Sequence, residues 1–173
     1  PLSVVLDVGC GRGEYGDHPE RYASRLRIFK DKVAKVIGVD VSEGGYQNPY
    51  IDEFYMFEDD HWPIKDETAD VIISDWVLEH IETPRIFFSE AYRVLKKDGV
   101  ICIRTSNKWS YVSVIARVIP NRYHDRILSA IQEEREVEDV FPTVFKCNSP
   151  YRCKRFLREA SFEDIVVFTH DAE

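Results

Sequence analysis

The fold is decided by the stretch VVLDVGCGRG, residues 4–13. Its first five residues are mostly branched and apolar, which is typical of a strand in a parallel sheet covered on both faces. The glycines that follow, Gly9, Gly11 and Gly13, predict a tight turn in which the backbone lies close to a ligand, because glycine has no Cβ. Such a turn at the carboxyl end of a strand predicts a nucleotide-cofactor site.

The glycine spacing and Asp7 indicate which kind of cofactor this is. The spacing is G-x-G-x-G, whereas dinucleotide sites have G-x-G-x-x-G. Asp7 is expected at the mouth of the site, where a carboxylate repels a pyrophosphate and attracts a sulfonium or an ammonium group. No P-loop lysine follows the glycines. Residues 7–13, with Cys10 between the glycines, resemble the first motif of the class I S-adenosylmethionine-dependent methyltransferases.

A second strand is predicted over residues 36–40, after a helix at about 20–32. The helix is expected to place Tyr22, Leu26 and Phe29 on one face. Asp40 ends the strand, where a carboxylate can accept hydrogen bonds from both ribose hydroxyls of a nucleoside. We therefore expect Asp40, with its neighbour Val41, to bind the cofactor.

A third acidic site follows the short strand predicted at 54–57. A carboxylate here can accept a hydrogen bond from the exocyclic amine of adenine, and Trp62 or Ile64 can pack on the ring. An acidic surface loop is the alternative. The cofactor-binding residues expected in this loop are Asp59 first, then Asp60, and His61.

The fourth predicted strand, residues 69–74, leads into a run that ends at His80. From Trp62 to His80 the sequence resembles the small-molecule, methyltransferase type 11-like branch of the family. That resemblance implies that the strand end lies against the methionine portion of the cofactor, at Ser74, Asp75 and Trp76, and that the next residues face the methyl group.

A hydroxyl acceptor needs a base to take its proton, and three residues are candidates. His80 is the first, because it follows the strand that borders the methyl group. In the alternative reading His80 only bonds loop backbone. Glu79 and His124 are the other catalytic candidates.

The remaining pattern completes a single α/β domain. We expect a helix capped by Thr83 and Pro84, and a helix capped by Ser149 and Pro150. The other expected elements are a strand at 100–105, helices at 111–119 and 124–134, an extended stretch at 139–145, and a late strand at 165–168.

The fold class is therefore a doubly wound, mostly parallel Rossmann-like sheet with helices on both faces. The family usually closes with one further antiparallel strand, for which residues 171–173 leave no room, so we expect that strand to be trimmed away or the sheet edge to differ. Residues 1–106 are expected to form the cofactor-binding core and 107–173 the acceptor side, in one domain trimmed at both ends.

Composition narrows the function classes. The chain has 173 residues, a net charge of −8 and a pI near 5.2, which disfavours nucleic acid as the main partner. No apolar stretch approaches the roughly 20 residues of a membrane span, and no signal peptide is evident, so we expect a cytoplasmic protein. The cysteines have no C-x-x-C spacing and are expected to be reduced thiols without a metal. They are Cys10, Cys102, Cys147 and Cys153.

The resemblance implies an S-adenosylmethionine-dependent methyltransferase. A hydroxyl oxygen of a sugar, glycan or natural product is the expected acceptor, on family analogy. Asn107, Trp109 and Tyr111 are expected to line its pocket. A basic cluster at 152–158 either meets a phosphorylated or carboxylated acceptor or is a solvated helix face. The alternatives are an NAD-dependent oxidoreductase and a non-catalytic interaction module; the oligomeric state stays open.

Overall fold

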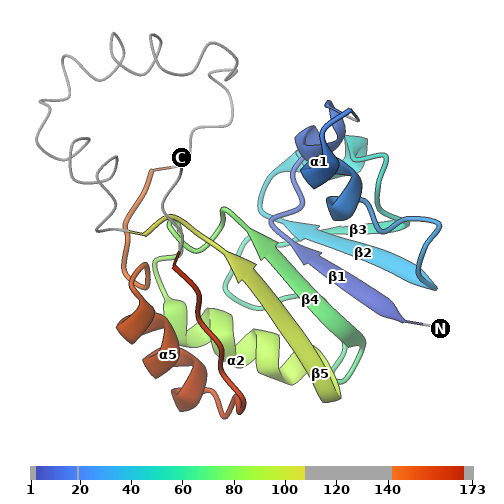
Figure 1. Ribbon diagram of the computed structural model, residues 1–173. Helices are drawn as coiled ribbons and strands as arrows, with labels where there is room; N and C mark the ends of the chain where they lie inside the picture. The colour runs from blue at the N-terminus through green and yellow to red at the C-terminus, as the bar shows by residue number, and fades with distance from the viewer. Residues whose placement is uncertain (1–2, 19, 108–141, 170–173) are drawn as a thin grey trace, which may run out of the picture.

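The computed structural model describes residues 3–18, 20–107 and 142–169. Its centre is a five-stranded parallel sheet in the order β3-β2-β1-β4-β5 (Figure 1). The strands are β1 Val4–Val8, β2 Lys35–Asp40, β3 Glu53–Met56, β4 Ala69–Asp75 and β5 Leu95–Arg104. The helices are α1 Tyr22–Arg27, α2 Pro84–Val94 and α5 Pro150–Glu159, with short 3-10 turns η1 Glu14–Gly16 and η2 Glu43–Gln47.

The strand order reverses at the centre of the sheet. β1 pairs with β2 on one side and with β4 on the other, so the connections after β1 and β4 leave in opposite directions. In doubly wound folds ligands bind at this switch point, beyond the carboxyl ends of the strands. The predicted fold class, a parallel Rossmann-like sheet, is confirmed.

Helices cover both faces of the sheet. The main apolar cluster joins Leu6 and Ile72 of the sheet to Phe88 of α2 and Leu157 of α5. A second cluster on the α1 side contains Cys10, Val36 and Ile51, with Phe29 packed against it. In Figure 1, α2 and α5 lie on one side of the sheet and α1 on the other.

The predicted helix at 20–32 is wrong in length and in the face that it buries. α1 has only six residues, because Ile28 is already extended (φ −86°, ψ 111°). Tyr22 and Leu26 are 72% and 57% exposed. The residue that α1 turns toward the sheet is Arg27, whose side chain is 12% exposed.

Trp62 and Ile64 also differ from expectation. They are 2% and 7% exposed and belong to the main cluster, where the Trp62 ring meets Phe87 edge-on at 5.4 Å. Both side chains are therefore committed to the core. The prediction that one of them packs on adenine is wrong.

The later elements are confirmed in part. α5 begins as predicted, with the Ser149 hydroxyl accepting a hydrogen bond from the Arg152 N–H. β5 begins at Leu95, five residues before the predicted strand, because α2 ends at Val94 and the chain enters the sheet at once. Thr83 precedes α2 without capping it through its side chain; its hydroxyl donates to Asp60 instead.

The strand predicted at 165–168 is not formed. Ile165 packs against the main cluster, whereas Val166 and Phe168 are 70% and 88% exposed, and within the described ranges no strand pairs with them. Of the predicted stretch at 139–145, residues 142–145 are described and irregular. The helices predicted at 111–119 and 124–134 lie outside the described residues. None of the described helices is long and apolar enough to cross a membrane.

Candidate cofactor and acceptor site

The glycine turn after β1 has the backbone that its sequence requires. Gly9, Gly11 and Gly13 have φ values of 73°, 49° and 91°. A Cβ at Gly9 would lie 2.2 Å from Cγ2 of Val77, in the loop after β4. The glycine turn therefore packs against the loop after β4, so the 7–13 motif and the run that ends at His80 are in contact.

Replacing Gly9 with alanine is expected to lower the free energy of unfolding by about 3 kcal/mol, from the left-handed φ and the contact with Val77 together. Gly44→Ala is the matched control, since its nearest neighbour is Ser42 Oγ at 3.5 Å and its φ is ordinary. Urea unfolding of the two variants measures the difference. Equal midpoints would contradict the close packing of the turn.

Asp40 holds the glycine turn in place. It is 8% exposed; Oδ2 accepts from the Gly11 N–H at 2.8 Å and Oδ1 from the Ser42 N–H at 2.9 Å. Each carboxylate oxygen keeps a further lone pair for a ribose hydroxyl. Val41 follows with its side chain 53% exposed.

Asn48 is a support of this turn that the sequence analysis missed. Its Nδ2 donates to the carbonyls of Cys10 and Gly11, and its Oδ1 accepts from the Tyr50 N–H. Cys10 contributes its carbonyl to the turn, because its side chain is 2% exposed and packed in the second cluster. The Asn48-Pro49 pair suggested a turn but gave no sign of this contact.

Asp7 lies at the carboxyl end of β1, paired with a residue that the sequence did not reveal. The Arg27 Nη2 donates to Asp7 Oδ1 at 2.5 Å, and Asp7 is 1% exposed. The Arg27 Nε lies 3.6 Å from Asp75 Oδ2, and its guanidinium lies 4.7 Å from the centre of the Tyr15 ring. On the other side, Asp75 accepts two hydrogen bonds from Arg104.

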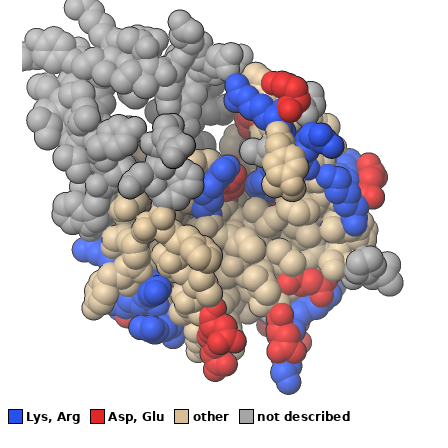
Figure 2. All heavy atoms as spheres, viewed as in Figure 1, with Lys and Arg blue, Asp and Glu red and all other residues tan. Residues whose placement is uncertain are grey.

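Burial and charge act against each other in this cluster. Burial raises the pKa of Asp7, and Arg27 opposes that effect without cancelling it. Burial also acts to lower the pKa of Arg27, but the facing Asp7 carboxylate outweighs it and the pKa is raised. The positive charge of Arg27 thus offsets part of the cost of burying the Asp7 carboxylate. Figure 2 shows basic and acidic side chains close together over α1, above a largely uncharged surface in the middle of the view.

The loop after β3 is held toward α2. Asp59 accepts from the His61 N–H, and Asp60 accepts from the Thr83 hydroxyl. The His61 Nδ1 lies 3.1 Å from Glu90 of α2. All three loop side chains are exposed.

At the end of β4, the three residues expected to meet the cofactor differ in exposure. Ser74 is fully buried, and its hydroxyl has no hydrogen-bond partner among the described residues. Trp76 is 47% exposed with φ 59°, and its ring lies 5.2 Å from the Arg104 guanidinium. Asp75 lies between them in the ion pairs described above.

Glu79 and His80 have different surroundings. Glu79 is 4% exposed and accepts hydrogen bonds from the hydroxyls of Thr105 and Ser106, at 2.7 and 2.9 Å. Asn148 donates to Thr105, a contact across 43 residues that no local pattern indicates. The His80 Nδ1 lies 3.1 Å from the Pro142 carbonyl. His124, Trp109 and Tyr111 are outside the described residues.

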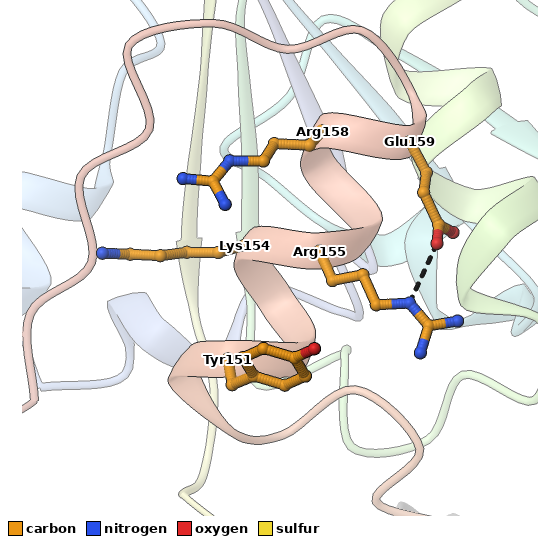
Figure 3. A pocket seen from close by; sticks show the side chains of 5 residues that line it. All are labelled: Tyr151, Lys154, Arg155, Arg158 and Glu159. Carbon is orange, nitrogen blue, oxygen red and sulfur yellow. Dashed lines mark hydrogen bonds and ion pairs between the residues drawn. The ribbon is translucent and has the colours of Figure 1, made fainter.

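The basic cluster forms a shallow hollow of about 270 Å³ on α5 alone, lined by Tyr151, Lys154, Arg155, Arg158 and Glu159 (Figure 3). Lys154 and Arg158 point to the same side, whereas Arg155 turns to Glu159 at 2.9 Å. No strand-end residue lines the hollow, which agrees with the solvated helix face considered for this cluster.

The four cysteines are free thiols, and the Sγ atoms of Cys147 and Cys153 are 3.6 Å apart. In the described part of the chain, no group of three or more His, Cys, Asp or Glu side chains is arranged to hold a metal ion.

Comparison with known proteins agrees with this geometry. A family model described as a methyltransferase domain matches residues 2–163. The chain belongs to this family, the class I S-adenosylmethionine-dependent methyltransferases, and the cofactor of the family is S-adenosylmethionine.

Two curated relatives show how far the similarity extends. A protein of Mycolicibacterium smegmatis, named a probable S-adenosylmethionine-dependent methyltransferase, is 29% identical over 136 residues, which are 74% of this chain and 47% of that protein. A malonyl-[acyl-carrier protein] O-methyltransferase of Yersinia pestis is 27% identical over 106 residues, 59% of this chain and 36% of that protein. The chain thus spans less than half the length of either relative.

A crystal structure of an S-adenosylmethionine-dependent methyltransferase from Archaeoglobus fulgidus has the same fold. The TM-score is 0.59 at 21% identity, and the alignment covers 94% of this chain and 62% of that one.

The residues present suit the family's cofactor. The turn places glycine backbone without side chains at the carboxyl edge of the sheet. The groups around it include the carboxylates of Asp7, Asp40 and Asp75, of which Asp7 is paired with Arg27 and Asp75 with Arg104. A pyrophosphate would be repelled by this set, whereas a nucleoside with a positive sulfur and an amino-acid end matches it in charge.

Proposed function

We propose that the chain transfers a methyl group from S-adenosylmethionine to a hydroxyl oxygen of a small molecule, such as a sugar, a glycan or a natural product. The observation that carries the choice of a hydroxyl is the hydrogen bond between the His80 ring and the Pro142 carbonyl. The name of the Yersinia pestis relative, an O-methyltransferase, also supports oxygen as the methylated atom.

The Pro142 carbonyl decides which ring nitrogen of His80 carries the proton. A carbonyl only accepts, so Nδ1 donates, and in the neutral imidazole Nε2 then has the lone pair. Nε2 is the atom that we expect to take the acceptor's hydroxyl proton. Bound S-adenosylmethionine supplies a methyl group activated on positive sulfur.

Glu79 is the weaker candidate for the base. Both of its carboxylate oxygens accept hydrogen bonds from Thr105 and Ser106, and its backbone carbonyl accepts from Val144 and Phe145. These bonds favour a role in joining the loop after β4 to the start of the 142–149 segment.

We assign the cofactor to the carboxyl ends of the strands at the centre of the sheet. Asp40 would hold the ribose and the glycine turn would lie against the nucleoside, with Asp59 as first choice for the adenine amine. Ser74, Asp75 and Trp76 would border the methionine portion. A small-molecule partner and a cytoplasmic location belong to the same proposal.

Asp40→Ala is expected to weaken the binding of S-adenosylhomocysteine about 100-fold, because two charge-assisted hydrogen bonds to the ribose are lost. Asp52→Ala is the matched control: its carboxylate also accepts from a backbone N–H at 2.8 Å, but at the opposite edge of the sheet. Calorimetric titration of both variants, with NAD as a second ligand, tests the site. Binding of NAD alone would favour an oxidoreductase, and binding of neither ligand a non-catalytic module.

The acceptor class is tested by measuring S-adenosylhomocysteine release with a panel of sugars, phenols, carboxylates and amines. Release with hydroxyl compounds supports the proposal. Release with amines alone contradicts it.

A further inference from the structure

Cys147 and Cys153 bring two free thiols into contact at the start of α5. Their Sγ atoms are 3.6 Å apart, and the residues are six positions apart in the chain. The backbone turns back between them, because the Ser149 N–H donates to the Cys147 carbonyl and the Cys153 N–H donates to the Ser149 carbonyl. A disulfide places its sulfurs about 2.05 Å apart, so these two need to approach by only about 1.5 Å.

The two thiols differ in their surroundings. Cys147 is fully buried in the main apolar cluster, whereas Cys153 is half-buried and packed against that cluster. Among the residues that the structure describes, no third His, Cys, Asp or Glu side chain joins them in a group that could hold a metal ion. A pair of thiols without a metal, one of them within reach of solvent, is suited to oxidation.

The hydrogen bond between the two thiols indicates which one is the nucleophile. The Cys147 thiol donates this bond and the Cys153 sulfur accepts it. The bond lowers the pKa of Cys153 against the opposing effect of burial, and together with burial it raises the pKa of Cys147. Cys153 also lies in the first turn of α5, where the helix dipole favours an anion. The reactive thiolate therefore belongs to Cys153, the more accessible of the two.

We propose that Cys147 and Cys153 form a site of reversible oxidation that reacts with a small hydroperoxide such as hydrogen peroxide. This inference goes beyond the proposed function and does not depend on it. The Cys153 thiolate attacks one peroxide oxygen, the O–O bond breaks, and the hydroxide that leaves takes up the proton that Cys153 released. The Cys147 sulfur gives up its proton and attacks the resulting sulfenic acid, and the S–O bond breaks to release water. The two thiols thus lose two electrons and two protons, and the peroxide is reduced to two waters.

The disulfide has two consequences for the protein. Cys147 consumes the sulfenic acid on Cys153 before a second peroxide oxidises it irreversibly. The bond also links the 142–149 segment covalently to α5. Asn148 of that segment donates to Thr105, which donates to Glu79, so the oxidation takes place next to the hydrogen bonds that reach the candidate site.

Peptide mapping tests the inference, because trypsin cuts after Lys146, Arg152 and Lys154 and so separates the two cysteines. The full chain is reduced, treated with hydrogen peroxide, blocked with iodoacetamide and digested without reductant. Mass spectrometry should find peptide 147–152 joined to peptide 153–154, and dithiothreitol should release both. We expect the pair to be oxidised at least about 10-fold faster than the exposed Cys102. In urea the same bond should form at least about 10-fold more slowly, because the fold no longer holds the sulfurs together.

Single variants test the role assigned to each thiol. Cys147→Ser leaves Cys153 without its resolving partner, so we expect a sulfenic acid that dimedone traps, followed by a sulfinic acid. In Cys153→Ser we expect Cys147 to stay reduced, since it is fully buried. Cys102→Ser is the control and should form the disulfide as the unsubstituted chain does. Absence of the linked peptides, earlier oxidation of Cys102, or an equal rate in urea overturns the inference.

Discussion

Replacing His80 with glutamine is expected to lower kcat for methyl transfer to a hydroxyl acceptor by about 10²- to 10⁴-fold. The variant loses the nitrogen that takes the hydroxyl proton, while its amide can still donate to the Pro142 carbonyl. Initial rates at saturating S-adenosylmethionine and acceptor measure the effect.

Two controls separate this role from a structural one. Glu79→Gln removes a carboxylate that Thr105 and Ser106 bond, so it should lower stability while kcat falls much less than in His80→Gln. His80→Gln should bind S-adenosylhomocysteine within about threefold of the unsubstituted protein. A kcat of His80→Gln within about threefold of the unsubstituted value would assign the base to another residue.

Arg93→Met is expected to lower the free energy of unfolding by about 3 kcal/mol, because it leaves the mostly buried Glu90 carboxylate without its arginine partner. The Arg93 guanidinium also donates to Asp66 and to the carbonyls of Trp62 and Ile64. These hydrogen bonds join the loop before β4 to α2. Arg85→Met on the same helix is the control, since the Arg85 side chain is 65% exposed; its loss should cost less than about 1 kcal/mol.

The Arg93–Glu90 ion pair also makes the stability of the protein depend on pH. Burial raises the pKa of Glu90, but hydrogen bonds from Arg93 and from the Trp62 N–H outweigh it and hold the pKa below its ordinary 4.5. The stabilisation is therefore complete above pH 4.5 and is lost as the pH falls through the lower, folded-state value. In urea unfolding between pH 3 and 7, Glu90→Gln should differ most from the unsubstituted protein at neutral pH. A constant difference would contradict this assignment.

The sheet could be predicted from the sequence because its strands have a recognisable local pattern. Residues 4–8, 36–40 and 69–74 are short apolar runs that end at a glycine turn or an acid, and all three are strands. The positions of Asp40 and of the glycines at the carboxyl edge of the sheet follow from the same local pattern. Parallel strands with crossovers then leave few arrangements to choose from.

The hydrogen-bond and ion-pair partners of the charged residues could not be predicted from local sequence patterns. The role of Arg27 was not predicted, because helical periodicity placed the apolar residues Tyr22 and Leu26 inward. In the structure they are exposed, and Arg27 pairs with the buried Asp7 carboxylate. Trp62 was predicted to pack on adenine, yet it is buried against Phe87 of α2. Each of these outcomes depends on a contact between residues far apart in the chain.

The central position of β1 also bears on how the chain folds. β1 precedes the other described strands in the chain, but one of its two edges is completed by β4, and the bond from the Val4 N–H to Asp70 spans 66 residues. Pairings this distant form slowly, and an open strand edge can recruit a strand from another chain. We therefore expect residues 69–75 to protect this edge of β1 from aggregation once they pair with it.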